Sequence, residues 1–112
     1  RRPSKGLLGG MWEYPGGKCE PGETLPACLQ RELMEELGIE VQVDEPFGVY
    51  EHAYTHFSVT LHAFQCRIHQ GEPQALHASE IRWVQPEELT NLPMGKIDRQ
   101  ISQRILAELF PE

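Results

Sequence analysis

The chain has 112 residues, of which 17 are acidic and 10 are basic, so its formal net charge is −7. This acidic balance excludes duplex binding driven by bulk positive charge, and the 39% hydrophobic content disfavours intrinsic disorder. No apolar run approaches the roughly 18 residues of a membrane span, so no membrane partner is expected. At this length we expect a single domain over residues 1–112.

The excess of negative charge lies in one third of the chain. Residues 13–45 hold nine acidic side chains and only two basic ones, Lys18 and Arg31, whereas the rest of the chain holds eight of each. A uniformly acidic surface would serve solubility. A concentrated charge needs a local reason, and a bound cation is one.

The first part of the chain is predicted to be a loop followed by a helix. Glycine and proline punctuate residues 1–22, which favours a loop with a short strand at residues 11–14. A helix is predicted over residues 25–37, because Thr24 can cap its start and Gly38 suits the left-handed position after its end.

Beyond this helix, alternating apolar side chains predict short strands. They cover residues 39–43, 47–53, 57–68 and 81–84. Residues 44–46 (Asp-Glu-Pro) are expected to end the first of them. Pro86 opens a helical turn, and residues 97–109 carry apolar side chains at i+4 spacing, which predicts a final amphipathic helix. Strands mixed with two segregated helices make an α+β fold.

The helix over residues 25–37 carries the candidate chemistry. Its leucines form a core stripe, and Glu32, Glu35 and Glu36 share the adjoining arc, with Glu36 at the edge of the stripe. Three like charges repel one another there, and Glu36 would also be partly desolvated. A solvated acidic face is the alternative. A hard cation such as Mg²⁺ would relieve the repulsion, and Arg31 can orient the cluster by pairing with Glu35 and with Glu23.

These residues match a known signature. Gly17, five residues, Glu23, seven residues and then the run RELMEELGI at residues 31–39 resemble the Nudix box without a departure. The preceding run WEYPGGK, residues 12–18, looks like the loop that leads into the box in MutT-type members. The resemblance implies a Nudix-type α/β/α sandwich around a mixed sheet. Because such a sheet has strands before the position of Arg1, we expect the domain to be N-terminally incomplete and to lack its first strands.

Nudix enzymes hydrolyse nucleoside diphosphates linked to another group, and they use Mg²⁺ or Mn²⁺. By position, the resemblance makes Glu32, Glu35 and Glu36 catalytic metal ligands, joined by the backbone carbonyl of Gly16, with Glu32 also a candidate general base. The run SEIRW resembles the segment where MutT-type enzymes place a further metal-binding or base glutamate. Glu80 is therefore a candidate ligand and catalytic residue, and an ordinary surface glutamate is the alternative.

Outside the box the resemblance points in two directions. One is the MutT-type 8-oxo-dGTP diphosphatases, and the other is the C-terminal domain of MutY-type adenine DNA glycosylases, which residues 6–15 and 54–57 resemble. Because the box is complete, we favour hydrolysis of a small-molecule nucleotide, 8-oxo-dGTP before others, to the monophosphate and pyrophosphate. The alternative is a non-catalytic 8-oxoguanine-recognition domain, with duplex DNA as its partner. Either would be a monomer or a homodimer.

The same resemblance supplies the candidates for substrate binding, which are Arg2, Glu13, Gly16, Gly17, Lys18, His56 and Asp98. Arg2 matches an arginine that contacts phosphate, and Asp98 can accept hydrogen bonds from guanine N1–H and N2–H. A terminal arginine without a role and an acid that merely suits the helix dipole are the alternatives.

The remaining cysteine, histidine and tryptophan residues are given no catalytic role. The three cysteines form no CxxC pair and leave an odd count, which suits a reducing, cytoplasmic compartment. The other histidines are expected to be scattered over the surface. Trp12 and Trp83 are expected in the core.

Overall fold

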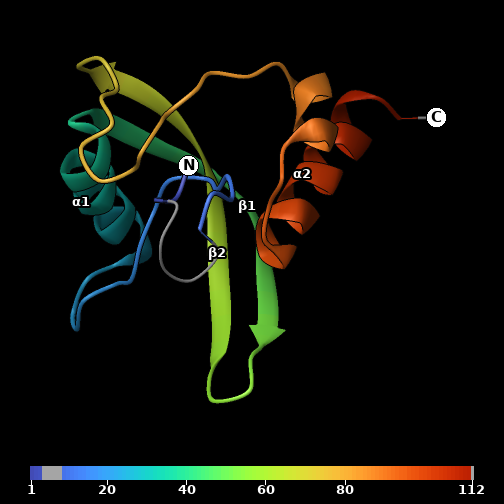
Figure 1. Cartoon of the computed structure of the whole chain (residues 1–112). Coiled ribbons are helices and arrows are strands. Elements are labelled where there is room, and N and C mark those ends of the chain that lie inside the picture. Colours follow the sequence, from blue (N-terminus) through green and yellow to red (C-terminus); the bar gives the residue numbers. More distant parts are fainter. Residues whose placement is uncertain (4–8, 112) are drawn as a thin grey trace.

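A computed structural model describes residues 1–3 and 9–111 of the chain. Within them the elements are α1 (Leu25–Leu37), β1 (Glu40–Ala53), β2 (Ser58–Gln70), the short 3-10 helix η1 (Pro86–Asn91) and α2 (Lys96–Leu109). The two strands pair as an antiparallel hairpin, which α1 and α2 flank on opposite sides in Figure 1. This arrangement is the predicted α+β class.

Local signals at both ends fix α1 where the sequence predicted it. The Thr24 hydroxyl accepts a hydrogen bond from the N–H of Ala27 at 3.2 Å, which caps the first turn. Gly38 follows the last turn in the left-handed conformation, with φ of 68°, and its N–H donates to the carbonyl of Met34.

A small apolar cluster anchors α1 to the start of β1. Leu33, Ile39 and Val41 are each 4% exposed, and Leu29, Leu37 and Val43 pack around them. Burying one such side chain contributes on the order of 2 kcal/mol. Because the leucine stripe faces this cluster, the glutamates on the adjoining arc are held at the edge of the core.

The predicted end of a strand at residues 44–46 is wrong. β1 continues through Pro46, and its pairing with β2 shifts register between Val43 and Pro46 and again between Pro46 and Gly48. An irregularity of this kind accommodates a residue that has no N–H to give to the ladder. Two predicted strands are therefore one.

The segments before and after the hairpin are less regular than predicted. Residues 11–14 form a single parallel bridge, Trp12 to Met94, rather than a strand. Trp12 is 9% exposed, as predicted, whereas Trp83 is 79% exposed and lies outside any strand, so its predicted core position is wrong. The helical turn at Pro86 and the final helix are confirmed.

Neither long helix has the dimensions of a membrane span. α1 has 13 residues and α2 has 14, against the roughly 20 apolar residues that a spanning helix needs. Over the described residues, no helix is long and apolar enough to cross a membrane.

Candidate active site

The glycine-rich loop lies directly against the acidic face of α1. The N–H of Gly16 donates to the Glu36 carboxylate at 3.3 Å, and a Cβ added at Gly17 would overlap the Glu32 carboxylate. Glu32 and Glu36 are one helical turn apart and so face the same way. One short stretch of backbone therefore meets both carboxylates, and at Gly17 it can do so because the residue has no side chain.

Electrostatic conditions at Glu36 disfavour its charged form. Burial raises the pKa of Glu36, and the charges of Glu32 and Glu13 raise it further, while the Gly16 N–H and the charge of His77 act in the opposite direction. A half-buried carboxylate that faces like charges is a place where a cation is stabilised.

Arg31 is the centre of an ion-pair network beside these carboxylates. Its guanidinium binds both oxygens of Glu23, at 2.7 and 2.9 Å, and reaches Glu32 at 2.9 Å and Glu35 at 3.2 Å. It also donates to the carbonyl of Lys18 at 3.1 Å. Its hydrogen bonds lower the pKa of Glu23 to about 2. Arg31 therefore ties the loop to the helix and fixes the position of Glu32.

The donor atoms at this contact fit a hard divalent cation. Mg²⁺ and Mn²⁺ prefer oxygen ligands, and the carboxylates of Glu32 and Glu36 and the carbonyl of Gly16 are such ligands. Across residues 1–3 and 9–111, no three acidic, histidine or cysteine side chains are already gathered as a metal centre, and Arg31 holds Glu32 and Glu35 toward itself. The Glu32 side chain is 14% exposed and that of Glu35 is 50% exposed, so Glu35 lies at the solvent-exposed edge of the carboxylate cluster.

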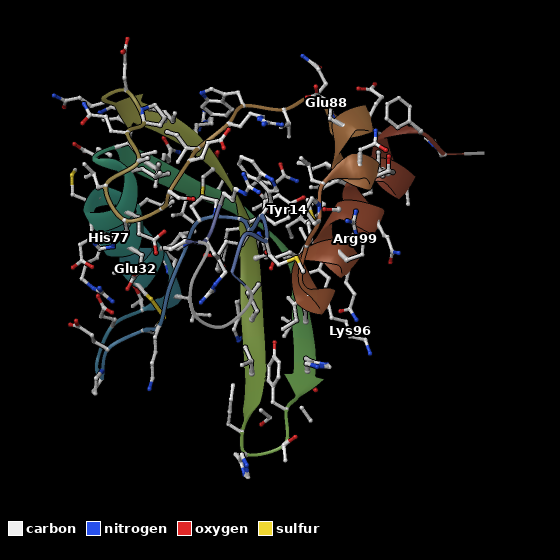
Figure 2. The ribbon with its side chains drawn as sticks, viewed as in Figure 1. Tyr14, Glu32, His77, Glu88, Lys96 and Arg99 are labelled. Atoms are coloured by element: carbon white, nitrogen blue, oxygen red, sulfur yellow. A yellow bond between two sulfur atoms is a disulfide. The ribbon has the colours of Figure 1, made fainter. Side chains whose placement is uncertain are left out.

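A second group of predicted residues lies between the loop and α2. The N–H of Tyr14 donates to Asp98 Oδ1 at 3.1 Å, and the Tyr14 hydroxyl lies 2.7 Å from Ser102 Oγ. Burial raises the pKa of Asp98, and the charge of Glu13 adds to this. Arg2 pairs with Glu13 at 2.9 Å. Figure 2 shows Tyr14 on the α2 side of the molecule, away from Glu32.

Glu80 and His56, two further predicted site residues, have other surroundings. The Glu80 carboxylate pairs with Arg1 at 3.6 Å and with Arg82 at 3.3 Å. His56 is exposed in the turn between β1 and β2, and this turn lies at the end of the hairpin away from α1 (Figure 1). Lys18 has an exposed side chain and contributes its carbonyl to Arg31.

Sequence reasoning missed His77, which the structure brings to the acidic face of α1. The N–H of Gln74 donates to the carbonyl of Leu37 at 2.9 Å, and that of Leu76 donates to the carbonyl of Glu36 at 3.1 Å. These bonds pin the segment after β2 to the last turn of α1, and the next residue is His77, whose charge acts on Glu36. Figure 2 shows His77 and Glu32 on the same side of the molecule. The run Gln-Gly-Glu-Pro at residues 70–73 is typical of a turn, and it is a sequence signal that this segment changes direction.

Known proteins are similar to this chain in sequence and in fold. A NUDIX domain model matches residues 1–104. A CTP pyrophosphohydrolase of Escherichia coli strain K12 is 34% identical over 107 residues, which are 96% of this chain and 79% of that protein. An 8-oxo-dGTP diphosphatase of Proteus vulgaris is 42% identical over 64 residues, 57% of each chain. The crystal structure of a MutT protein from Methanosarcina mazei Go1 is 25% identical with a TM-score of 0.84, covering 98% of this chain and 82% of that one.

The fold, the acidic face of α1 and the matched domain agree on a class of enzyme. The chain belongs to the NUDIX domain family and is a Nudix hydrolase. The expected similarity to a glycosylase domain, in contrast, rests on the sequence resemblance alone.

We expect Gly17→Ala to displace the Glu32 carboxylate and leave the fold in place, because the obstacle to the new Cβ is the end of a flexible side chain. Affinity for Mn²⁺, measured by titration, should fall about tenfold or more, and Tm should shift by only a few degrees. Gly22→Ala is the control, since it adds a Cβ in open space at φ of 85° and so carries backbone strain without touching Glu32. Unchanged Mn²⁺ binding by the Gly17 variant would rule out Glu32 as a ligand.

We expect Asp98→Asn to gain stability over the wild type as the pH rises from acidic to neutral. The pKa of Asp98 is raised in the folded state by burial, so its protonated form stabilises the fold at low pH. That contribution is lost as the pH rises through the raised pKa. Asn keeps an oxygen for the Tyr14 N–H and carries no charge. Urea unfolding at several pH values measures the difference, and Glu51→Gln controls for removing one exposed negative charge. A difference that stays constant with pH would contradict the burial argument.

Proposed function

We propose that the chain hydrolyses a nucleoside triphosphate to the monophosphate and pyrophosphate, with Mg²⁺ as its metal, replaceable by Mn²⁺, and 8-oxo-dGTP as its favoured substrate. The observation that carries this proposal is the contact of Gly16 and Gly17 with Glu32 and Glu36, beside Arg31. The names of two relatives support it, since CTP and 8-oxo-dGTP are both nucleoside triphosphates. Those two nucleotides differ in the base and in the sugar, and they share the triphosphate.

Each group at the acidic face has a task in this proposal. Bound Mg²⁺ supplies neutralising charge for the diphosphate and a lower pKa for the attacking water. Glu32, Glu36 and the Gly16 carbonyl would hold it. Glu32 Oε1 accepts a hydrogen bond from Arg31, which leaves Oε2, the atom facing Gly17, to bind the metal or take a proton from water. Arg31 keeps Glu32 in place.

The base would be recognised on the α2 side of the loop. Asp98 Oδ1 accepts a hydrogen bond from the Tyr14 N–H, and the lone pairs of the carboxylate can also accept hydrogen bonds from purine N–H groups. The exposed Lys18, whose carbonyl accepts a hydrogen bond from Arg31 of α1, would contact a phosphate on the α1 side. Arg2, which is paired with Glu13, is the second candidate for this role.

The alternative is a domain that recognises 8-oxoguanine in DNA without hydrolysing anything. Residues 6–8, part of the stretch that resembles a glycosylase domain, lie outside the described residues. A domain that binds duplex DNA has to lie on phosphates, and the clustered carboxylates of Glu32, Glu35 and Glu36 would repel them. Hydrolysis gives these carboxylates a use.

The direct test is turnover of a nucleotide panel with Mg²⁺. We expect 8-oxo-dGTP to be cleaved to the monophosphate and pyrophosphate with a higher kcat/KM than dGTP or CTP, and chelation of the metal to stop the reaction. Glu36→Gln should lower kcat by about 100-fold or more. Glu40→Gln, at the exposed start of β1, is the matched control. A panel without turnover, together with selective binding of 8-oxoguanine duplexes, would support the alternative instead.

Kinetics of two variants can decide whether His77 or Glu80 contributes to catalysis beside Glu36. Because the segment after β2 is pinned to α1 just before His77, we expect His77→Ala to lower kcat/KM about tenfold or more. Glu80→Gln should leave it within about twofold, since the Glu80 carboxylate is engaged by two arginines. Steady-state kinetics of both variants measure this. A large loss of kcat/KM in Glu80→Gln with little loss in His77→Ala would instead support Glu80 as the catalytic residue.

A further inference from the structure

The cysteines form a bond that the sequence did not predict. Cys19 and Cys28 are joined by a disulfide with their Cα atoms 5.2 Å apart, and Cys66 is free and exposed on β2. The odd count, which predicted a reducing compartment, is therefore a pair and one remaining thiol. The pair lies in the loop and helix that build the acidic face.

We propose that Cys19 and Cys28 are a reversible thiol–disulfide site that clamps the glycine-rich loop onto α1, oxidised by hydrogen peroxide and reduced by a dithiol. The clamp itself is independent of the substrate. Its effect on metal binding rests on the proposed function, since it assumes that Glu32 and Glu36 hold the metal.

The positions of the two cysteines carry this inference. Cys19 follows Gly17 by two residues, and Gly17 touches the Glu32 carboxylate. Cys28 precedes Glu32 by one helical turn, so the two side chains share a face of α1. The disulfide therefore joins the loop to α1 close to the point where Gly17 lies against the Glu32 carboxylate.

Without this bond, polar contacts remain to hold the loop. Arg31 joins the loop to α1 through Glu23 and the Lys18 carbonyl, and it lies 3.8 Å from Glu20, whose side chain is 66% exposed. The exposed Arg31–Glu20 pair adds little stability, and Gly22 gives the enclosed segment backbone freedom. A covalent link that closes this short loop removes many of its open conformations.

The difference in exposure between the two sulfurs sets the order of the chemistry. Cys19 is exposed and Cys28 is 3% exposed. The Cys19 thiolate attacks one peroxide oxygen and the O–O bond breaks, giving a sulfenic acid and, after proton uptake, water. The Cys28 thiolate then attacks the Cys19 sulfur, and hydroxide leaves and takes a proton to form a second water. Two thiols are oxidised by two electrons and one peroxide is reduced.

Reduction runs through the same exposed sulfur. A thiolate of the dithiol attacks Cys19 and releases the Cys28 thiolate, which takes up a proton. The second thiol of the reagent then attacks the mixed disulfide and releases Cys19, so the dithiol leaves as its cyclic disulfide. Both cysteines are returned to thiols, and the loop is left to its polar contacts.

The first test counts thiols and measures unfolding in the full chain carrying Cys66→Ser, which prevents bonds between molecules. Peroxide should remove both remaining thiols, and dithiothreitol should restore them. The oxidised form should unfold at a Tm roughly 10 °C higher than the reduced form. Cys19→Ser should abolish both changes and still fold, because Cys19 is exposed. Two thiols that persist after peroxide treatment, or equal Tm values for the two forms, would overturn the clamp.

The second test measures Mn²⁺ affinity of the oxidised and reduced forms by titration. A loop held in place should bind the ion about three- to tenfold more tightly in the oxidised form, and the Cys19→Ser variant should behave as the reduced form under both conditions. Equal affinities would overturn the link between the clamp and the metal site. Absence of Mn²⁺ binding in both forms would tell against the proposed function, while the thiol count and Tm still decide the clamp.

Discussion

The close approach of a glycine backbone to two carboxylates is the constraint on which the rest of the structure depends. Gly16 and Gly17 can lie against Glu36 and Glu32 only if α1 is held still and the loop is held down. The apolar cluster around Leu33 meets the first requirement by anchoring α1 to β1. Arg31 meets the second by bonding to both the loop and the helix. The fold therefore brings negative charges together at a place where partial burial weakens the screening of their repulsion by water.

The distribution of counter-charges shows where that repulsion remains. Arg31 lies within ion-pair distance of Glu20, Glu23, Glu32 and Glu35, and the pKa of Glu23 is lowered accordingly. Glu36 has a raised pKa, because it is half-buried and faces the charges of Glu32 and Glu13. The pKa values of two glutamates in one cluster are thus shifted in opposite directions. Residues 13–45 carry a net charge of −7. Within this segment, Arg31 pairs with the glutamates around it, whereas the environment of Glu36 still disfavours its negative charge.

What could be predicted from the sequence was determined by local interactions. The bounds of α1 follow from Thr24, which caps the N–H of the residue three positions later, and from the glycine after the last turn. The spacing of the glutamates places them on one face of the helix, regardless of how the helix packs. The strand end predicted at residues 44–46 was wrong because a proline can either end a strand or occupy an irregularity within it. Which of the two occurs depends on how the partner strand pairs with it. The positions of His77 and Cys19 depend on chain segments folding back onto α1, and no local pattern encodes such a contact.

The loop of residues 12–17 contacts both of the helices that flank the hairpin, and in the proposed function metal binding and base recognition lie at its two ends. Its glycine end touches α1, and its other end is fixed to α2 through Tyr14, Asp98 and Ser102. In the proposed function the phosphates therefore lie toward α1 and the base toward α2. Substitutions on α2 can then alter which base is accepted without disturbing the carboxylates. Relatives named for a pyrimidine and for an oxidised purine triphosphate both match this chain, as expected if the α1 side serves the triphosphate that they share.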